Sequence, residues 1–583
     1  MNLGERFFQT VSTHADRKAL RWKEENGWRS WTYAEMGDQV RKYARGLLAL
    51  GLSKGDRVAI LSRNRPEWAV ADLGAVSIGC VTVPIYSTST PETIRHILDH
   101  SESRILVLSA GDSFDWSRSR REQFPRLDHV ILLDPAPGNS KDPGIRSFSD
   151  IMGMGQGVPA EDVEKAMDRV DASDISTLMY TSGTTGKPKG VMLTHRNVET
   201  NASSMTGCYP VGPSDVVLSS LPMSHAFERT IGMYMMLFAG AEIAYAESLA
   251  TVPQNLLEVR PTIMLAVPRM LEKFYGRIHE AMDQKPTLIR WLFKRSVRHA
   301  EKCRCRTLCP WVRGSDRLFF KKIRERMGGR MRLIGSGGAA LSEGIARFFG
   351  AVGLNVLQGY GLTETSPVMA ANRPDRNRFG TVGPAIPDVD IKIADDGEVL
   401  VRGPNVMKGY YKDAGATAEV FTPGGWFKTG DIGEIDADGF LRITDRKKEM
   451  IKTSGGKYIA PQPMENELKL SPLIEQACIV GEGQKYVAAL IVPNFSLLET
   501  RTREEGIQAA TRGDLVANST VREWYSDLIK KFNENRASYE TIKRFELLSD
   551  EWTIQDGEIT PTLKLRRKVI AERHATAIEN LFR

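Results

Sequence analysis

The sequence is poor in cysteine and has no apolar run long enough to cross a bilayer. Six cysteines in 583 residues do not form a disulfide framework, and a reducing compartment suits that number. The longest apolar stretch, residues 231–246, is interrupted by Glu242 and falls short of the ~20 residues that a spanning helix needs. Residues 1–10 lack the basic start and apolar run of a signal peptide. We therefore expect a soluble, cytoplasmic protein.

Repeats and low-complexity tracts are also absent. Hydrophobic residues make up 41% of the chain and charged residues 26%, which excludes a disordered or fibrous protein. At the usual size of domains, a chain of this length is expected to form two or more of them.

Positive charge is concentrated in one segment. The net charge is +7, but residues 285–332 hold 16 Lys/Arg against 3 Asp/Glu, which leaves the rest mildly acidic. This distribution does not indicate a nucleic-acid binder. Within the segment, residues 289–298 mix apolar and cationic side chains at near-helical spacing. They predict either a helix at a membrane surface, giving a peripheral contact with its inner face, or a solvated helix with a buried apolar stripe.

Strand-like apolar runs alternate with helical patterns through the first two thirds of the chain. Residues 57–61, 81–85, 104–108 and 129–133 read as strands, and residues 66–79 read as a helix. The alternation predicts an α/β fold with layered, largely parallel sheets.

The composition of the sequence changes near residue 444. A turn-rich stretch gives way to the charged residues 445–449 and then to a shorter α+β segment. We predict a large N-terminal domain over residues 1–444 and a small C-terminal domain over residues 445–583, with residues 445–448 as either a hinge or a plain charged linker.

The strongest local motif is Tyr180-Thr-Ser-Gly-Thr-Thr-Gly-Lys-Pro-Lys-Gly190, between two apolar segments. Its glycines allow tight turns that expose backbone N–H groups, and its hydroxyls and lysines complete a cradle for phosphate oxygens. It is not a Walker loop, because Pro188 stands where a magnesium-holding hydroxyl is required.

With four later motifs, this loop resembles the AMP-forming acyl-adenylating superfamily, and in particular its long-chain fatty acyl-CoA synthetases. The later motifs are Gly359-Tyr-Gly-Leu-Thr-Glu-Thr365, Trp426-Phe-Lys-Thr-Gly-Asp431, Asp445-Arg-Lys-Lys-Glu449 and Pro561-Thr-Leu-Lys564. The resemblance implies the acyl-CoA synthetase/luciferase-like fold, with a mobile C-terminal lid. It also implies that ATP, Mg²⁺ and coenzyme A are used.

The resemblance implies a nucleotide site. Tyr360 would stack on adenine, Asp431 would accept hydrogen bonds from the ribose, and Arg446 would contact ribose and phosphate. Glu364 and Thr181 would hold Mg²⁺. The remaining nucleotide and coenzyme A positions are Ser182, Gly183, Thr184, Thr185, Gly186, Gly338, Ala339, Gly361, Thr363, Lys448, Gly455 and Gly456.

Four residues are catalytic candidates. Lys564 matches the lysine that contacts the reacting carboxylate, although a surface lysine is the alternative. His225, in Leu221-Pro-Met-Ser-His-Ala-Phe-Glu-Arg229, would lie near the fatty acyl carboxylate or serve as a structural histidine. Lys187 and Lys189 would meet the phosphates. The cluster His299, Cys303, Cys305 and Cys309 matches no common metal spacing.

We expect a ligase that joins a long-chain fatty acid to coenzyme A through an acyl-adenylate, releasing AMP and pyrophosphate. A ligase that passes the acyl group to an acyl carrier protein has the same ATP motifs and stays open. A catalytically silent, membrane-associated lipid-binding relative is the alternative from another class.

Overall fold

The computed structural model describes most of the chain. The described residues are 1–109, 126–134, 144–181, 188–302, 309–534, 536–553, 555–560 and 565–583. The phosphate loop residues 182–187 and the segment 561–564 lie outside this description. No helix in the described ranges is long and apolar enough to cross a membrane.

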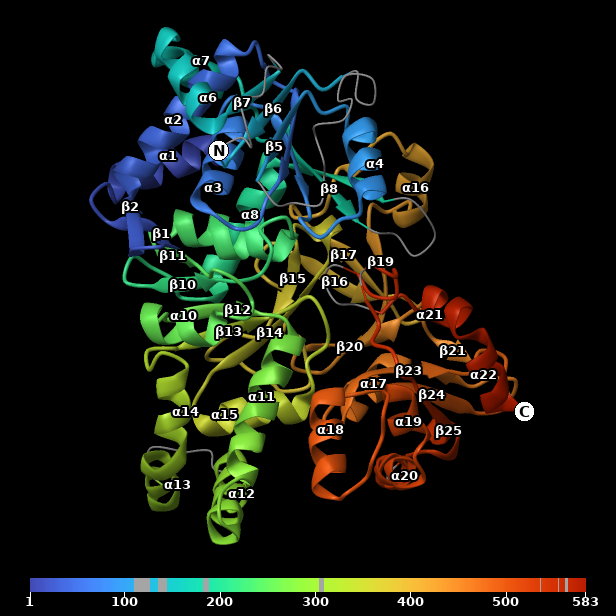
Figure 1. Ribbon diagram of the computed structural model, residues 1–583. Helices are drawn as coiled ribbons and strands as arrows, with labels where there is room; N and C mark the ends of the chain where they lie inside the picture. Colours follow the sequence, from blue (N-terminus) through green and yellow to red (C-terminus); the bar gives the residue numbers. More distant parts are fainter. Residues whose placement is uncertain are drawn as a thin grey trace.

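One large sheet occupies the upper part of the molecule (Figure 1). Its order is β18-β9-β8-β4-β3-β5-β6-β7, with parallel pairing from β8 to β7. Strands β4 and β5 are buried along their whole length, as parallel strands covered on both faces must be. The strands are β3 (Arg57–Leu61), β4 (Val81–Ile85), β5 (Ile105–Leu108), β6 (His129–Leu132), β7 (Ile145–Ser147), β8 (Ile175–Thr181), β9 (Lys189–Thr194) and β18 (Gly409–Tyr410).

A second large sheet has the order β15-β14-β13-β12-β10-β11-β1-β2. Its central pairs are parallel and its two outer pairs are antiparallel, so the predicted layered and largely parallel α/β fold is confirmed. The strands are β1 (Lys18–Glu24), β2 (Gly27–Thr32), β10 (Val216–Ser219), β11 (Glu242–Tyr245), β12 (Ile263–Ala266), β13 (Leu333–Ser336), β14 (Val356–Gly361) and β15 (Val368–Ala371).

The remaining sheets are small. An antiparallel sheet has the order β16-β17-β19-β20, and the C-terminal segment holds the sheets β21-β22 and β23-β24-β25. The predicted boundary at residue 444 falls inside β20. The strands are β16 (Asp390–Ile393), β17 (Glu398–Arg402), β19 (Phe427–Ile435), β20 (Leu441–Arg446), β21 (Ile451–Lys452), β22 (Tyr458–Ile459), β23 (Ile474–Val480), β24 (Val487–Pro493) and β25 (Ile542–Leu547).

Helices begin where side chains satisfy their free N–H groups. Asn2 and Thr32 form capping boxes with Glu5 and Glu35, and Pro66 starts α3 without needing an N–H. The main helices are α1 (Leu3–Thr13), α2 (Tyr33–Ala49), α3 (Pro66–Ser77), α4 (Pro91–Ser101), α8 (His195–Cys208), α10 (Val252–Val259), α11 (Pro268–Asp283), α12 (Thr287–Lys302), α13 (Pro310–Ser315), α14 (Lys321–Arg326), α15 (Glu343–Val352), α16 (Ala414–Val420), α17 (Pro461–Leu468), α18 (Phe495–Glu504), α19 (Arg512–Ala517), α20 (Ser519–Asn533), α21 (Arg567–Arg573) and α22 (Ala575–Phe582).

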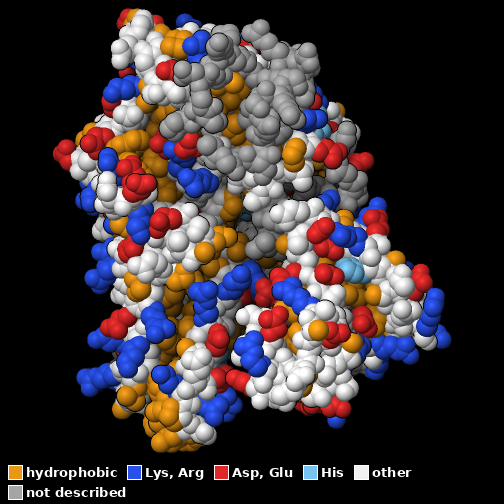
Figure 2. Space-filling model, viewed as in Figure 1, with side chains coloured by type: hydrophobic (Ala, Val, Ile, Leu, Met, Phe, Trp, Pro, Cys, Tyr) orange, Lys and Arg blue, Asp and Glu red, His pale blue; other side chains and the backbone are white. Residues whose placement is uncertain are grey.

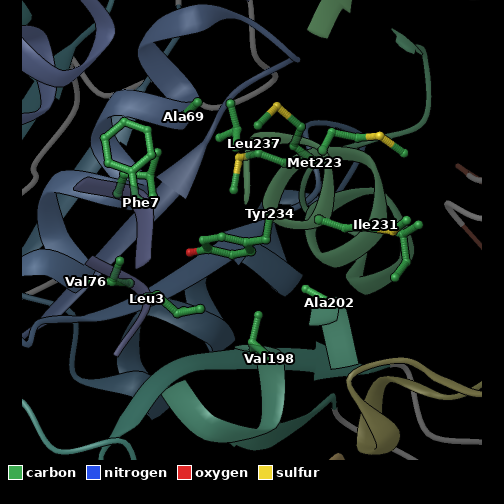
Figure 3. Close-up of a cluster of buried hydrophobic side chains, with 14 of the residues drawn as sticks. Leu3, Phe7, Ala69, Val76, Val198, Ala202, Met223, Ile231, Tyr234 and Leu237 are labelled. Carbon is green, nitrogen blue, oxygen red and sulfur yellow. The ribbon is translucent and has the colours of Figure 1, made fainter. Parts of the chain in front are cut away.

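The largest hydrophobic core joins α1, α2, α3 and α8 to a buried helical segment, residues 228–238. Phe7, Tyr234 and Leu237 meet at its centre (Figure 3). A separate core lies in the C-terminal segment, and its buried members run from Ile451 to Leu581. The C-terminal segment therefore has its own core, as an independent folding unit requires.

A buried ion pair crosses the large core. Arg229 donates to Asp72 Oδ1 at 2.5 Å, and the Tyr234 hydroxyl donates to Asp72 Oδ2 at 2.6 Å. The same guanidinium also donates to Thr82 and Thr177 on the first sheet. With every charge paired and hydrogen-bonded, the network fixes the start of the 228–238 segment against α3 and β8.

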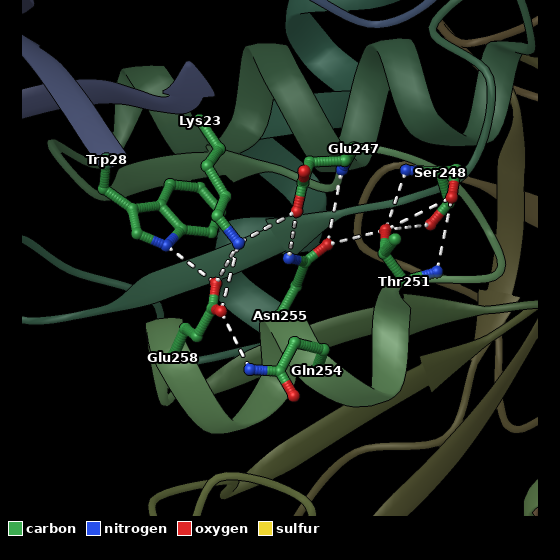
Figure 4. A network of polar contacts seen from close by, with 8 residues as sticks. All are labelled: Lys23, Trp28, Glu247, Ser248, Thr251, Gln254, Asn255 and Glu258. Carbon is green, nitrogen blue, oxygen red and sulfur yellow. Dashed lines mark hydrogen bonds and ion pairs between the residues drawn. The ribbon is translucent and has the colours of Figure 1, made fainter. Parts of the chain in front are cut away.

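At the surface, a polar network ties the β1–β2 hairpin to α10 (Figure 4). Lys23 Nζ lies 3.0 Å from Glu258 and 3.3 Å from Glu247, and Trp28 Nε1 donates to Glu258 at 2.9 Å. Hydrogen bonds from Gln254 and Lys23 hold the pKa of Glu258 near 2. The network therefore fastens the hairpin at this edge of the second sheet to α10.

Candidate active site

A deep cleft of about 2730 Å³ separates the N-terminal sheets from the C-terminal core. Its walls come from segments that are far apart in the sequence, including the carboxyl ends of β8, β13 and β14. Most predicted site residues that are described line it, namely Thr181, Lys189, His225, Gly338, Ala339, Tyr360, Gly361, Thr363, Glu364, Asp431, Arg446 and Lys448.

Two of these residues, Tyr360 and Arg446, make direct contacts with Asp431. The antiparallel register of β19 and β20 places Asp431 opposite Arg446, and Arg446 Nε lies 3.2 Å from Asp431 Oδ1. The Tyr360 hydroxyl donates to Asp431 Oδ2 at 2.5 Å. Burial alone would lower the pKa of Arg446, but the nearby Asp431 and Glu449 have the larger effect together and raise this pKa. Asp431 is therefore a fixed carboxylate at the cleft wall.

Small residues form the wall beside Tyr360. A side chain at Gly361 would bring a Cβ within 1.9 Å of the Pro367 carbonyl oxygen, so only glycine fits there. A Cβ added at Gly337 would lie 3.2 Å from the Phe227 ring, and Gly338 has φ +83°, a conformation that favours glycine. This wall leaves room for a flat group to lie close to the backbone.

Glu364 is held by a neighbour that the sequence did not single out. The Tyr410 hydroxyl donates to Glu364 Oε1 at 2.9 Å, and Met407 N donates to the Glu364 carbonyl at 2.8 Å. Tyr410 reaches this position because β18 pairs with β9. In the sequence, the two adjacent tyrosines after Gly409 were the one sign of this contact. Their position beside Glu364 could not be predicted, because it depends on the long-range pairing of β18 with β9.

The donors near Glu364 suit Mg²⁺ on a phosphate. A carboxylate and the Thr181 hydroxyl are hard oxygen ligands, and both residues line the cleft. Within the described ranges no group of three or more His, Cys, Asp or Glu forms a cage for a metal. Mg²⁺ that is bound to a nucleotide needs few protein ligands, so Glu364 and Thr181 are the residues of this cleft that could hold it.

The two strands that flank the predicted phosphate loop meet at Thr181 and Lys189, which are paired in the β8–β9 register. Lys189 Nζ lies 3.6 Å from Asp413 and 5.2 Å from the centre of the Tyr410 ring. The loop residues Ser182, Gly183, Thr184, Thr185, Gly186 and Lys187 lie outside the described residues. Tyr410, which lies beside Lys189, is the same residue that donates a hydrogen bond to Glu364.

His225 lines the cleft, and its Nδ1 accepts a hydrogen bond from Phe227 N at 3.2 Å. Three residues on, Glu228 points into the core and is 1% exposed. Neither of its carboxyl oxygens has a hydrogen-bond partner of normal geometry among the described residues. Burial raises the pKa of Glu228 to about 8, against a small opposing effect of the nearby Ser219 hydroxyl.

The C-terminal segment contributes one wall of the cleft. Thr560 and Leu565 line it, whereas Lys564 lies outside the described residues. Gly455 and Gly456 do not line the cleft and lie in an exposed turn between β21 and β22. Asp445 also borders the cleft with little exposure to solvent, and burial raises its pKa to about 6.

The histidine and cysteine cluster lies far from the cleft. His299 Nε2 is 3.2 Å from Cys309 Sγ near the end of α12, while Cys303 and Cys305 are outside the described residues. A metal role for this cluster has no support from the described side chains.

Two sequence profiles match the chain. The profile described as AMP-binding enzyme covers residues 7–411, and that described as AMP-binding enzyme C-terminal domain covers residues 448–583. A protein of Mycobacterium bovis named long-chain-fatty-acid–CoA ligase FadD15 is 35% identical over 564 residues, which is 95% of this chain and 92% of that protein. The peroxisomal long chain acyl-CoA synthetase 7 of Arabidopsis thaliana is 30% identical, over 100% and 86% of the two chains.

Solved structures share the fold. The adenylation domain of a carboxylate reductase from Mycobacterium chelonae has a TM-score of 0.79 at 22% identity, over 100% of this chain and 91% of that one. The anthranilate CoA ligase AuaEII, solved with anthranoyl-AMP, has a TM-score of 0.75 at 19% identity, over 99% and 98%.

Proposed function

Since this chain belongs to the AMP-binding enzyme family, we propose that it joins a long-chain fatty acid to coenzyme A at the expense of ATP. The proposal that the substrate is a long-chain fatty acid rests on the 35% identity, over almost the whole chain, to a protein named as a long-chain-fatty-acid–CoA ligase.

The reaction needs two steps, because a thiol cannot displace oxide from a carboxylate. In the first, a carboxylate oxygen bonds to the α-phosphorus of ATP and the bond to pyrophosphate breaks. In the second, the thiol sulfur bonds to the acyl carbon, the thiol gives up its proton, and AMP leaves. Both steps develop negative charge on phosphate oxygens, which cations around the cleft stabilise.

We assign roles to the cleft residues on this basis. Asp431 accepts the ribose hydroxyls, with Tyr360 and Arg446 holding its two oxygens in place. Lys189 and, from the sequence, Lys187 and Lys564 supply positive charge to the phosphates and carboxylate. Glu364 and Thr181 hold Mg²⁺, which when bound neutralises phosphate charge.

The test is release of pyrophosphate from ATP with acids from acetate to oleate, with coenzyme A or an acyl carrier protein as acceptor. The expected result is acyl-CoA and AMP from acids of long chain length. Transfer to the carrier protein alone would favour the alternative ligase. An absence of ATP–pyrophosphate exchange with every acid would refute the proposal and favour the silent lipid-binding relative.

We also propose that residues 445–583 move as a lid about residues 445–448. Their separate core supports this proposal. In the present arrangement, polar contacts cross the cleft from Asn466 Nδ2 to the Ala340 carbonyl at 3.3 Å and from Arg269 to Glu475. A disulfide between Ala340→Cys and Asn466→Cys should leave adenylate formation intact and stop thioester formation until it is reduced. Thioester formation in the oxidised protein would contradict the lid, and the two single-cysteine variants are the controls.

We propose that the basic segment 285–332 contacts a membrane surface. Helix α12 buries Phe293, Ser296 and Ala300, yet it leaves Leu288 and Trp291 65% and 53% exposed on another side. A buried apolar stripe alone does not explain these two residues. Hydrophobic side chains with lysines and arginines beside them gather at the lower end of the molecule, where α12 and α13 lie (Figures 1 and 2). Apolar anchors among cations fit an anionic lipid surface.

Vesicle sedimentation tests this surface. Wild-type protein should bind phosphatidylglycerol vesicles more than phosphatidylcholine vesicles, and Leu288→Ser with Trp291→Ser should weaken binding at least about tenfold, since each buried anchor is worth about 1.5–3 kcal/mol. Leu257→Ser, at an exposed leucine of α10, is the matched control. Equal binding by the double variant and wild type would contradict the assignment.

A further inference from the structure

Two histidines of α4 face the strand ends that flank the predicted phosphate loop. His96 and His100 are four residues apart and therefore lie on one face of the helix. Their rings stack with centroids 5.5 Å apart at an angle of 27°. We call them the histidine pair.

His100 contacts β8, and His96 contacts the residue that directly precedes β9. His96 Nε2 lies 3.0 Å from the Pro188 carbonyl oxygen, and His100 Nδ1 lies 2.8 Å from the Tyr180 hydroxyl. A carbonyl oxygen only accepts, so Nε2 of His96 carries the proton. Thr181 directly follows Tyr180, and Lys189 directly follows Pro188.

The surrounding packing restricts the hairpin ends. The Tyr180 ring meets both imidazoles edge to face, with centroids 6.3 Å from His96 and 5.7 Å from His100. Gly190, opposite Tyr180 in the register, is so close that an added Cβ would lie 3.2 Å from the Tyr180 ring. Tyr411 packs on the other side of His100, with centroids 5.7 Å apart. Aromatic rings therefore surround the hydrogen bonds that the two histidines make with Tyr180 and Pro188.

The charges that face the pair come from several segments. Lys412 Nζ donates to the His100 carbonyl at 3.1 Å and pairs with Glu102 at 3.0 Å, and Asp413 lies nearby. Burial lowers the pKa of His100, and the neighbouring His96 and Lys412 lower it further. His100 is therefore neutral at pH 7, and its contact with Tyr180 is a hydrogen bond between neutral groups.

We propose that His96 and His100 are positioning residues for ATP, because they hold the two strand ends that carry Thr181 and Lys189. This inference rests on the proposed ATP site. The histidine pair itself touches no substrate in this arrangement, since neither ring lines the cleft. The histidine pair would set the distance between Thr181 and Lys189, the two strand ends between which the phosphates would bind.

Paired substitutions test the proposal. His96→Leu and His100→Leu remove the hydrogen bonds, and each should weaken ATP binding about two- to tenfold, as expected for the loss of one such bond. His96→Gln places a donor near the position of Nε2, and His100→Asn places a polar atom near Nδ1. Both should stay within about twofold of wild type. The measurements are the Kd of Mg·ATP by calorimetry and the KM values for ATP and for the fatty acid.

The readouts separate positioning from a general loss of structure. Positioning predicts a higher Kd and KM for ATP with the KM for the acid unchanged, and rescue by the conservative variants. His14→Leu changes a half-buried histidine away from the cleft and should leave the Kd of ATP unchanged. Leucine variants that bind ATP like wild type, or that raise both KM values equally, would overturn the proposal.

Different results would refute the proposed ligase function and the proposed role of the histidine pair. Wild-type protein that binds ATP but makes no acyl-CoA would refute the ligase assignment, while the ratio of Kd values would still decide the role of the histidine pair. Wild-type protein that does not bind ATP would overturn both.

Discussion

Replacing Glu228 by glutamine should stabilise the protein, and increasingly so as the pH rises. The carboxyl group is buried without a hydrogen-bond partner of normal geometry among the described residues, and its pKa is raised from 4.5 to about 8. A carboxyl group whose pKa is higher in the folded state binds more protons than in the unfolded state between these two values. Folding stability therefore falls as the pH rises through that window.

The magnitude follows from the width of the window. Keeping Glu228 protonated at pH 7.5, well above its ordinary pKa of 4.5, costs about 4 kcal/mol, and near pH 5 the cost is below about 1 kcal/mol. Glutamine has no such cost, because it is neutral at every pH and similar in size. Residual hydration of the site would reduce these upper values.

Urea unfolding of wild type and Glu228→Gln at pH 5 and pH 7.5 measures the effect, since the difference between the two proteins cancels other titrating groups. The free energy of unfolding of the variant should exceed that of wild type by about 2–4 kcal/mol at pH 7.5 and by little at pH 5. Glu242→Gln, which loses an ion pair with Arg21, is the control and should gain nothing at pH 7.5. A difference that is the same at both pH values would refute the reasoning.

Three further substitutions have expected outcomes. Asp72→Ala leaves Arg229 buried without its carboxylate and should lower the free energy of unfolding by about 3–5 kcal/mol in urea. Tyr410→Phe removes the hydrogen bond to Glu364 and should raise the KM for Mg·ATP about two- to tenfold with unfolding unchanged. Asp431→Asn weakens charge-assisted hydrogen bonds and should lower kcat/KM for ATP at least about tenfold, and an unchanged value would remove this residue from the nucleotide site.

The sequence predicted elements with strong local patterns and missed contacts that depend on long-range pairing. The strands at 57–61 and 81–85 are confirmed, whereas the predicted helix 66–79 ends at Ser77 because Gly79 adopts φ +77°.

The same division applies to the site. The resemblance of the motifs to a known family implied that Tyr360, Asp431 and Arg446 belong to one site, and all three line the cleft. The contact of Tyr410 with Glu364 and the contacts of the histidine pair join segments 46 to 92 residues apart. Local sequence patterns hold no information on contacts between residues so far apart in the chain, so only the three-dimensional structure could reveal these contacts.

The pairing of β19 with β20 has a consequence for truncated forms of the protein. A fragment that ends at residue 411 would lack both strands and leave β17 without its neighbour β19. A fragment that ends at residue 444 would keep Asp431 but lose Arg446, its partner in the ladder. The shortest N-terminal piece with an intact Asp431 environment therefore extends through Arg446, so cutting the chain where its composition changes would also cut a strand.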